Sequence, residues 1–299
     1  MQQDKLLTIM GSPGSGKTTT AVKLARTLAA RRKNVVLVLC DPFTPVIPAL
    51  AGMAHDTSLG ALLTAPGLTQ GSILNACVPA PGSGYISLLG YRTGESLMGY
   101  PKVTRDKALE LFVSLRYLAD YVIIDCTAIF EADPASFVAI EAADRVLKMV
   151  TANLKGISWF QTHSPMLADS RYRKERQMTA IGNLKVGQDW ESVSGQYGGI
   201  DYMLPYTAEL EQQDNEMALF EPMFSQESTV YQAEINRILL DVFGFQVTPA
   251  RQTAKRKTDA ERAVPDRQEA ASMPAREARR EKSGKGGFKV PFARNRGEF

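Results

Sequence analysis

The sequence predicts an α/β protein with three layers, in which helices cover both faces of a mostly parallel, twisted sheet of about seven strands. Two observations support this class. Short, continuous apolar runs, which are typical of parallel strands buried on both faces, alternate along the chain with segments of helical period. The alternation stops near residue 247. We therefore expect one folded domain over residues 1–247 and a separate tail over residues 248–299.

The first expected elements are a strand, a helix and a second strand. The run LLTIM at 6–10 is a short apolar strand. From residue 17 to about residue 32, apolar residues recur at helical spacing, and basic residues crowd the last turn, where the helix dipole favours them. The run VVLVLC at 35–40 is followed by Asp41. Ligands of open α/β sheets bind at the carboxyl ends of the strands, so Asp41 is expected near a ligand.

The middle of the chain is less regular. Pro and Gly are frequent over residues 43–100, where we expect a short helix at 59–63 and a strand at 85–89. Leucines at helical spacing predict a helix over 107–118. The run YVIID at 121–125 is apolar and β-branched, and we expect a strand that ends in an acidic residue.

The second half continues the alternation. We expect helices over 134–142, 157–167 and 231–243 and strands over 143–150, 178–183 and 200–205. The following tail is rich in Ala, Arg, Lys, Glu, Ser and Pro and, apart from Val264 and Met273, lacks large apolar side chains until Phe288. Such a segment cannot bury enough surface to offset the entropy lost on ordering, so we predict disorder over residues 248–299.

Composition and charge indicate an ordinary globular protein with a basic tail. Hydrophobic residues make up 44% of the chain and charged residues 22%. The net charge of +3 is unevenly spread, because residues 248–299 carry 14 Lys/Arg and 7 Asp/Glu, a net of +7, which leaves −4 for the first 247 residues. Three cysteines without zinc-type spacing favour reduced thiols. Residues 1–5 are polar and no apolar run approaches a membrane span, so we expect a cytoplasmic protein.

The loop after the first strand fits the pattern G-x-x-x-x-G-K-[ST]. Its residues are Gly11, Ser12, Pro13, Gly14, Ser15, Gly16, Lys17, Thr18 and Thr19. Such a loop turns successive N–H groups into one concavity at a helix N-terminus, which favours phosphate. Lys17 would reach the β- and γ-phosphates, and the Thr18 hydroxyl would bind Mg²⁺. A glycine-rich turn without a ligand is the alternative, but the flanking strand and helix favour a nucleoside triphosphate site.

The strand at 121–125 has the form of a Walker B element, which carries an acidic residue to the Mg²⁺ shell. Asp125 is the acidic residue. Many strands end in this way, so the assignment of Asp125 as a metal ligand depends on the phosphate loop upstream.

With these motifs in view, the chain resembles the ParA/MinD ATPases, a branch of the P-loop NTPases, over about residues 4–245. The resemblance is carried by the early loop with its three threonines, by the strands VLVLCDP (36–42) and DYVIID (120–125), and by the segments ADRVL (143–147) and LPY (204–206). The phosphate-loop motif is specific for nucleotide binding. The other motifs are individually weak and support the resemblance through their order and spacing. The resemblance implies ATP and Mg²⁺ as ligands.

The resemblance also implies roles for two further residues. Asp41 would orient the water that attacks the γ-phosphate and would act in catalysis with Lys17. A carboxylate that caps the turn at Pro42 is the alternative. Asn183 would contact the nucleotide base, because an amide offers both a donor and an acceptor. A residue that ends the strand in a turn is the alternative.

The chain departs from the family at two places. The family commonly has a second lysine two residues into the loop, which reaches the partner's phosphates in an ATP-bound dimer, whereas this chain has Ser12 followed by Pro13. Residues Cys126, Thr127 and Ala128 stand where the family often has Thr-Pro-Pro. Both departures put rapid hydrolysis and lysine-dependent dimerisation in question. In lacking the lysine, the chain is more similar to the TadZ/CpaE-like proteins that position pili and to the VirC-like ATPases of conjugation.

The expected function is ATP binding with slow hydrolysis, used as a switch of homodimerisation or partner binding in plasmid or other DNA partitioning, conjugation, or polar positioning of a surface machine. Two alternatives stay open. One is an adaptor that binds ATP without hydrolysing it. The other is a small-molecule kinase or ligase, for which Tyr91, Arg92, Glu95 and Lys102 are the candidate second-substrate residues.

The basic tail is a candidate partner-binding segment. Its Lys and Arg residues could contact DNA phosphates without sequence preference. The alternatives are a peptide for a protein partner and a solvated linker. Glycine and proline interrupt any amphipathic period near residue 288, so contact with a membrane is not expected.

Overall fold

The computed structural model describes residues 4–52, 58–95, 99–100 and 102–247. The predicted disordered tail at 248–299 lies outside the described residues, and the domain boundary at residue 247 stays a prediction. None of the helices in the described ranges is long and apolar enough to cross a membrane.

One eight-stranded sheet forms the centre of the fold, with the strand order β3-β4-β2-β5-β1-β6-β7-β8. The strands are β1 (Leu6–Gly11), β2 (Val35–Cys40), β3 (Val78–Pro79), β4 (Ile86–Gly90), β5 (Tyr121–Cys126), β6 (Arg145–Val150), β7 (Gln177–Leu184) and β8 (Tyr202–Pro205). Every neighbouring pair is parallel except β3 with β4. This confirms the predicted mostly parallel sheet. The sheet has one strand more than expected. This strand, β3, has two residues and lies at the edge, where proline is tolerated because no further strand requires the backbone N–H that proline lacks.

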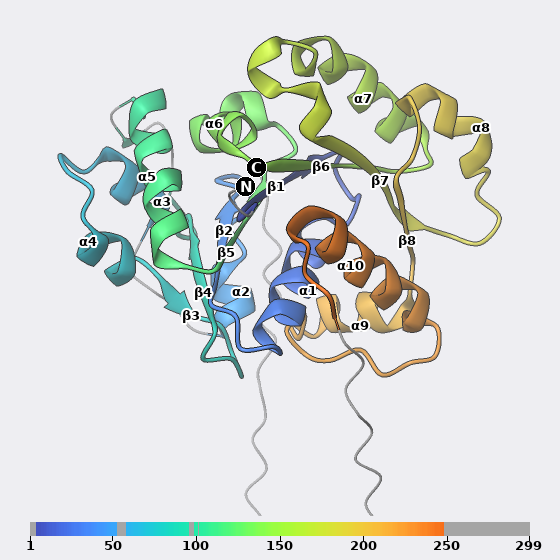
Figure 1. Ribbon diagram of the computed structural model, residues 1–299, viewed down its shortest axis with the longest axis horizontal. Coiled ribbons are helices and arrows are strands. Elements are labelled where there is room, and N and C mark those ends of the chain that lie inside the picture. The colour runs from blue at the N-terminus through green and yellow to red at the C-terminus, as the bar shows by residue number, and fades with distance from the viewer. Residues whose placement is uncertain (1–3, 53–57, 96–98, 101, 248–299) are drawn as a thin grey trace, which may run out of the picture. The chain divides into compact units, whose positions relative to one another are not determined.

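Helices cover both faces of the sheet, as predicted. They are α1 (Lys17–Ala29), α2 (Ile47–Ala51), α3 (Leu59–Thr64), α4 (Gln70–Asn75), α5 (Arg105–Leu118), α6 (Pro134–Ala142), α7 (Leu154–Leu167), α8 (Trp190–Ser194), α9 (Ala208–Asn215) and α10 (Ser228–Phe243). Helices α3 to α7 pack on one face, and α1, α2, α9 and α10 pack on the other. Figure 1 shows α6 and α7 on one side of the central strands and α1 and α10 on the opposite side.

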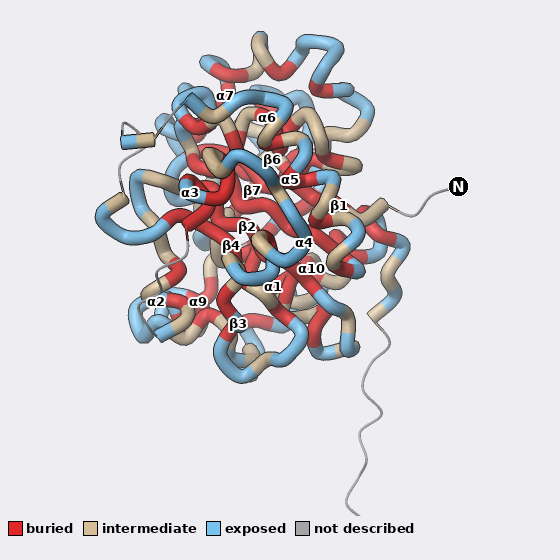
Figure 2. The backbone as a smooth tube through the Cα atoms, turned by 90° about the vertical axis from the view of Figure 1, so that its left-hand side faces the viewer, coloured by how far each residue is buried: buried red, intermediate tan, exposed pale blue. Residues whose placement is uncertain are grey.

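Two apolar layers arise because successive side chains of a strand point to opposite faces. In β2, Val36, Val38 and Cys40 join the layer under α3 to α7. Their neighbours Val35, Leu37 and Leu39 join the layer under α1 and α10. The buried segments therefore run through the middle of the molecule, and the exposed segments lie around them (Figure 2). This double burial explains why the strands appear in the sequence as continuous apolar runs.

Several expected element ends shift for identifiable reasons. The first helix ends at Ala29 rather than near residue 32, because the chain turns through Arg32, whose φ is +58°. Helix α7 begins at Leu154, three residues before the expected start, because the Asn153 side chain caps it by accepting from the Gly156 amide at 2.9 Å.

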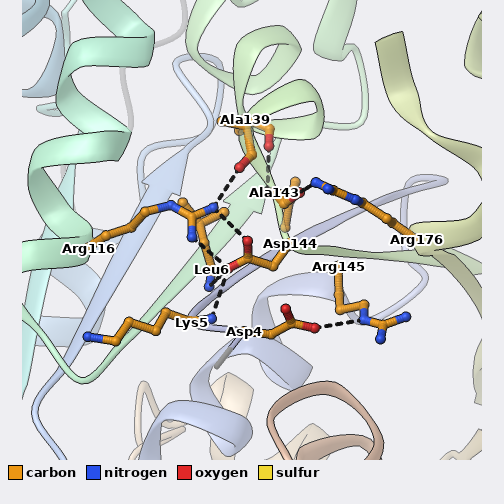
Figure 3. Close-up of polar contacts among 11 residues, drawn as sticks. Asp4, Lys5, Leu6, Arg116, Ala139, Ala143, Asp144, Arg145 and Arg176 are labelled. Carbon is orange, nitrogen blue, oxygen red and sulfur yellow. Dashed lines mark hydrogen bonds and ion pairs between the residues drawn. The ribbon is translucent and has the colours of Figure 1, made fainter. Parts of the chain in front are cut away.

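A polar cluster fixes the amino-terminal end of β1, which is the end away from the phosphate loop (Figure 3). The Asp144 carboxylate accepts from the backbone amides of Lys5 and Leu6 at 2.8 and 2.9 Å. Its two oxygens also accept from the Arg116 guanidinium at 2.7 and 2.9 Å. Burial alone would raise the pKa of Asp144, but these hydrogen bonds outweigh it and hold the pKa below its ordinary value. Asp144 therefore ties β1 to β6 and α5.

Candidate nucleotide-binding site

The loop between β1 and α1 is held in place by close backbone contacts that require glycine. Gly11 has a φ of +152°, and a Cβ there would lie 1.9 Å from the Met149 carbonyl oxygen. The next residue, Ser12, donates its amide to that same oxygen at 3.0 Å. Gly16, with a φ of +81°, is the residue that caps α1. A left-handed residue at this position lets the chain turn directly from the loop into the helix.

A second close approach supports the loop from β7. A Cβ on Gly182 would lie 2.0 Å from the carbonyl oxygen of Ser15. Sequence reasoning gave Gly182 no role, because the contact joins two segments that are far apart along the chain. The loop thus rests on β6 through Met149 and on β7 through Gly182.

Lys17 lies across the loop and donates its ammonium group to the Ser12 carbonyl at 3.1 Å. Burial lowers the pKa of Lys17, and the nearby carboxylates of Asp125 and Asp41 partly oppose this shift. The Ser12 hydroxyl is fully buried, and its oxygen has no hydrogen-bond partner within the described ranges. The loop therefore holds one cation and one buried hydroxyl that are available to an anionic ligand.

Thr18 and Asp125 meet although they are 107 residues apart. The Thr18 hydroxyl donates to Asp125 Oδ2 at 2.6 Å. The contact follows from the strand order, because β5 lies beside β1 and the alternation along β5 turns Asp125 towards α1. Burial raises the pKa of Asp125 to about 6, while Lys17 and Thr18 act to lower it. The second oxygen, Oδ1, is buried and unpaired among the residues that the structure describes.

Asp41 follows β2, and its contacts bear on both roles expected for it, the cap of a turn and the carboxylate near the γ-phosphate. Its Oδ1 accepts from the amides of Phe43 and Thr44 at 2.9 and 3.1 Å, so the carboxylate does cap the turn. Its charge also acts on Lys17 and Asp125, raising the pKa of each. Asp41 therefore lies on the side of the phosphate loop. Its action on a water molecule stays a prediction.

Asn183 lies at the edge of a cavity beside the phosphate loop. Its φ is +53°, and its Nδ2 lies 3.5 Å from the Gly14 carbonyl oxygen. The cavity measures about 310 Å³ and opens between the loop, the end of β8, and α9. It is lined by Gly14, Gly16, Thr19, Asn183, Pro205, Tyr206, Thr207, Leu210, Glu211, Asp214 and Tyr231. This volume is at the lower end of the range for small-molecule sites.

Helix α9 was missed in the sequence because it has no apolar stripe, and only Leu210 and Gln213 in it are buried. A signal for its start was present. Thr207 caps the helix by accepting from the Leu210 amide at 3.2 Å, and acidic residues follow in the first turn.

Lys23 ties the segment after α9 to α1. The residue is 2% exposed. Its ammonium group donates to the carbonyls of Leu219 and Glu221 at 2.7 and 2.9 Å and to the Gln213 side chain at 2.5 Å. Burial lowers the pKa of Lys23 to about 8. Since α9 forms one wall of the cavity, Lys23 positions that wall relative to the phosphate loop.

The residues at the loop fit a Mg²⁺–nucleotide group. Asp125 Oδ1 is an unpaired buried carboxylate oxygen next to a hydroxyl, which is the donor set that Mg²⁺ takes alongside phosphate oxygens. No cluster of three or more His, Cys, Asp or Glu side chains suited to a metal occurs among residues 4–52, 58–95, 99–100 and 102–247. A cation at this loop would therefore be shared between Thr18, Asp125 and the phosphates of a nucleotide.

Comparisons with known proteins agree with this fold. A family model described as Zeta toxin matches residues 2–66, the part that contains β1, the phosphate loop, α1 and β2. No curated protein matches the chain.

The solved structures similar to this chain include nucleotide complexes. A ParA family ATPase from Chlorobium tepidum TLS is 14% identical with a TM-score of 0.63, covering 78% of this chain and 97% of its own. The septum site-determining protein MinD from Pyrococcus horikoshii OT3, complexed with Mg-ADP, is 14% identical with a TM-score of 0.59, covering 78% and 95%. A protein described as a plasmid partition protein from Borrelia burgdorferi B31, bound to AMPPNP, is 17% identical with a TM-score of 0.60, covering 79% and 99%. The chain therefore has the fold of the ParA/MinD ATPases.

Proposed function

We propose that this protein binds Mg²⁺–ATP and hydrolyses it slowly, as a nucleotide-dependent switch of the ParA/MinD kind. The observation that carries the proposal is the contact between Thr18 and Asp125 beside the phosphate loop. This contact brings together the phosphate loop and the end of β5, which are 107 residues apart in the sequence. It leaves a buried carboxylate oxygen of Asp125 for a cation. The fold shared with nucleotide-bound proteins supports the proposal.

Each group at the loop has a place in this proposal. The loop amides and Lys17 bind the phosphates. Thr18 and Asp125 would hold Mg²⁺, which would supply positive charge to the phosphates of a bound nucleotide. Asp41 has one oxygen occupied by the turn amides, and we assign its other oxygen to orienting the attacking water.

The cavity beside the loop is proposed to hold the nucleoside. Asn183 lies at its edge with an amide that can pair with a base. The carboxylates of Glu211 and Asp214 line the cavity and can accept hydrogen bonds from ribose hydroxyls. In this proposal the phosphates, the base and the sugar have separate positions.

Calorimetric titration with Mg²⁺–AMPPNP tests the proposal directly. We expect saturable binding by the full chain, weakened at least tenfold without Mg²⁺. Lys17→Ala should abolish it, because the variant removes the cation within the loop. Lys33→Ala is a matched control, since Lys33 lies between α1 and β2, at the opposite end of the sheet. Absence of magnesium-dependent binding by the unmodified protein would refute the proposal.

Slow hydrolysis follows from the loop sequence. The position of the family's second lysine is occupied by Ser12, whose side chain is buried and carries no charge. A cation that stabilises transition-state charge is therefore missing from this place. Phosphate release should be slow, and its measurement with and without DNA separates a partitioning switch from an adaptor. A complete lack of turnover in both conditions would favour the adaptor.

We also propose that ATP drives formation of a homodimer through the face around the loop. Three apolar side chains lie just beyond the carboxyl ends of β2, β5 and β6 and are exposed: Phe43 at 57%, Ile129 at 57% and Leu154 at 85%. Exposed apolar side chains grouped on one face are typical of interaction surfaces. Their position next to the phosphate loop would let the γ-phosphate control their arrangement.

Size-exclusion chromatography with ADP and with AMPPNP tests the dimer. We expect a dimer with AMPPNP that Ile129→Asp abolishes. Tyr117→Asp is the matched control, because Tyr117 is 80% exposed near the opposite end of the sheet. An oligomeric state that does not change with nucleotide would contradict the switch.

The cellular process that the switch serves and the partner of the tail belong to the same proposal. DNA partitioning, conjugation and polar positioning all need a switch of this type, and the basic residues at 248–299 are our candidate contact for DNA or a protein partner. Deletion of residues 248–299 should leave AMPPNP binding unchanged. Loss of binding would place the domain boundary elsewhere.

The kinase or ligase alternative receives little support from its candidate residues. The Tyr91 hydroxyl is buried and donates to Asp133 Oδ1 at 2.6 Å. The Glu95 carboxylate accepts from the Ser58 hydroxyl and from the Arg92 amide. Internal contacts therefore account for Tyr91 and Glu95 without a second substrate.

A further inference from the structure

Lys148 is an unusual residue in the middle of an internal strand. Strand β6 lies between β1 and β7, and its other central residues, Val146, Leu147 and Met149, are buried and apolar. Alternation places Lys148 on the face covered by α7, together with Val146 and Val150. Lys148 is partly buried, and burying a charged group costs free energy unless it is paired, so its place in this strand needs an explanation.

A large cavity lies over Lys148. It measures about 680 Å³, and its floor is formed by β6 and β7, where Lys148 is the register partner of Thr179. One wall is α7 and the other is the segment 195–201 that leads into β8. Aromatic and aliphatic side chains of Phe160, Leu167 and Tyr197 line it. The cavity has the size and the mixed lining of a small-molecule site.

The cation of Lys148 has no direct anionic partner in the described residues. Its Nζ lies 5.4 Å from the centre of the Phe160 ring, and no hydrogen bond or ion pair joins it to these residues. Two other charged side chains line the cavity, Lys174 and Asp201. The Asp201 carboxylate accepts from the Thr179 amide through its Oδ2 at 2.7 Å, and its charge acts on Lys148 to raise the pKa of the ammonium group, in opposition to burial, without an ion pair between the two side chains. The cavity therefore contains two cations and one anion.

We propose that this cavity is a second ligand site, which binds a small organic anion. A carboxylate or phosphate group pairs with Lys148, and an apolar body packs against Phe160, Leu167 and Tyr197. An anion there supplies the ion-pair partner that Lys148 lacks, and an aromatic or aliphatic body contacts the apolar side chains of the lining.

This site is separate from the nucleotide site. The nucleotide cavity is bounded by α9 and α10 on one face of the sheet, and the Lys148 cavity is bounded by α7 on the other. Strand β7 contributes to both, with Asn183 at the first and Thr179 at the second. The proposal does not depend on nucleotide binding.

Nuclear magnetic resonance of the full chain labelled at lysine Cε tests the site, with benzoate and phenyl phosphate as probes. The Lys148 signal is assigned by its absence from the Lys148→Met spectrum. We expect a saturable shift of this signal and a rise of the Lys148 pKa by about one unit, since a paired anion favours the ammonium form. A response to benzoate alone identifies a carboxylate site and a response to phenyl phosphate alone a phosphate site, and either supports the proposal. No Lys148 shift at concentrations where the Lys33 signal begins to respond would overturn it.

Calorimetry on variants provides a second measurement. Lys148→Met should weaken binding of the responding probe at least tenfold, whereas Lys33→Met should leave it unchanged. Equal weakening by both variants would mean that only general surface charge attracts the probe, which overturns the proposal. Saturation with Mg²⁺–ADP should leave the Lys148 shift in place, and its loss would show that the probe occupies the phosphate loop instead. Should Lys148→Met not fold, Lys148→Arg, which keeps the positive charge, assigns the signal.

Discussion

The substitution Gly182→Ala tests how the phosphate loop is supported by the sheet. The added Cβ would lie 2.0 Å from the Ser15 carbonyl oxygen and 2.9 Å from Met149 Cε. The methionine methyl group ends a flexible side chain and can move, but the carbonyl is part of the loop backbone. Since real Cβ contacts are not shorter than 3.0 Å, the loop and β7 must separate by about 1 Å.

Two magnitudes follow for Gly182→Ala. Overpacking of this kind costs about 1–3 kcal/mol of unfolding free energy. Displacement of one loop amide from its phosphate oxygen removes a hydrogen bond to a charged group, worth about 1.5–3 kcal/mol, which is about a 10- to 150-fold loss of nucleotide affinity. Urea unfolding gives the first quantity, and calorimetric titration with Mg²⁺–AMPPNP gives the second.

Gly71→Ala is the matched control. Gly71 lies in α4, and the nearest atom to the new Cβ would be the Thr69 hydroxyl oxygen, at 3.9 Å. Alanine in a helix is favoured over glycine by about 0.5–1 kcal/mol, so this variant should be slightly more stable and should bind nucleotide normally. If Gly182→Ala matched the unmodified protein in both stability and affinity, the argument that β7 supports the loop would be refuted.

Further predictions concern three buried or partly buried charges, Asp125, Lys23 and Asp144. Magnesium-dependent nucleotide affinity should fall as the pH drops below about 6, because protonation of Asp125, whose pKa burial raises, removes a metal ligand. In the absence of nucleotide, the stability of the fold has the opposite pH dependence. Because burial raises the pKa of Asp125 in the folded state, Asp125 stabilises the fold in acid, and this stability is lost as the pH rises through about 6. Lys23→Met should lower the unfolding free energy by about 2 kcal/mol and weaken nucleotide binding, because it leaves the buried Leu219 carbonyl and the partly buried Glu221 carbonyl unpaired between α9 and α10. Asp144→Asn should cost about 2–3 kcal/mol by breaking the pair with Arg116.

Each of these predictions has a control. Titration of nucleotide in EDTA over the same pH range separates Asp125 from the ionisation of the phosphates, and an equal decline with and without magnesium would contradict the assignment of Asp125. Lys33→Met tests whether loss of any lysine mimics Lys23→Met. Asp120→Asn, at an exposed carboxylate that accepts one backbone amide, should cost well under the effect at Asp144. Equal effects at Asp120 and Asp144 would show that the buried cluster does not stabilise β1.

The sequence by itself determined the alternating strands and helices and the phosphate loop of this protein. The strands near residues 6–10, 35–40 and 121–125 were predictable because burial on both faces leaves a continuous apolar run. The loop was predictable because its glycines, Lys17 and Thr18 are contiguous, so that local geometry alone creates the phosphate cradle. Asp125 could be proposed as a metal ligand from its place at the end of a strand.

Only the tertiary structure decided what lies around the loop, because those contacts depend on strand order and not on local pattern. The position of β5 beside β1 brings Asp125 to Thr18, and the approach of β7 makes Gly182 a support of the loop. Helix α9 has too few apolar residues to give a periodic signal, and it is held by Lys23 from α1. Lys148 looks like one more residue of a strand in the sequence, and the cavity above it exists only because α7 and segment 195–201 pack apart on the far face of the sheet.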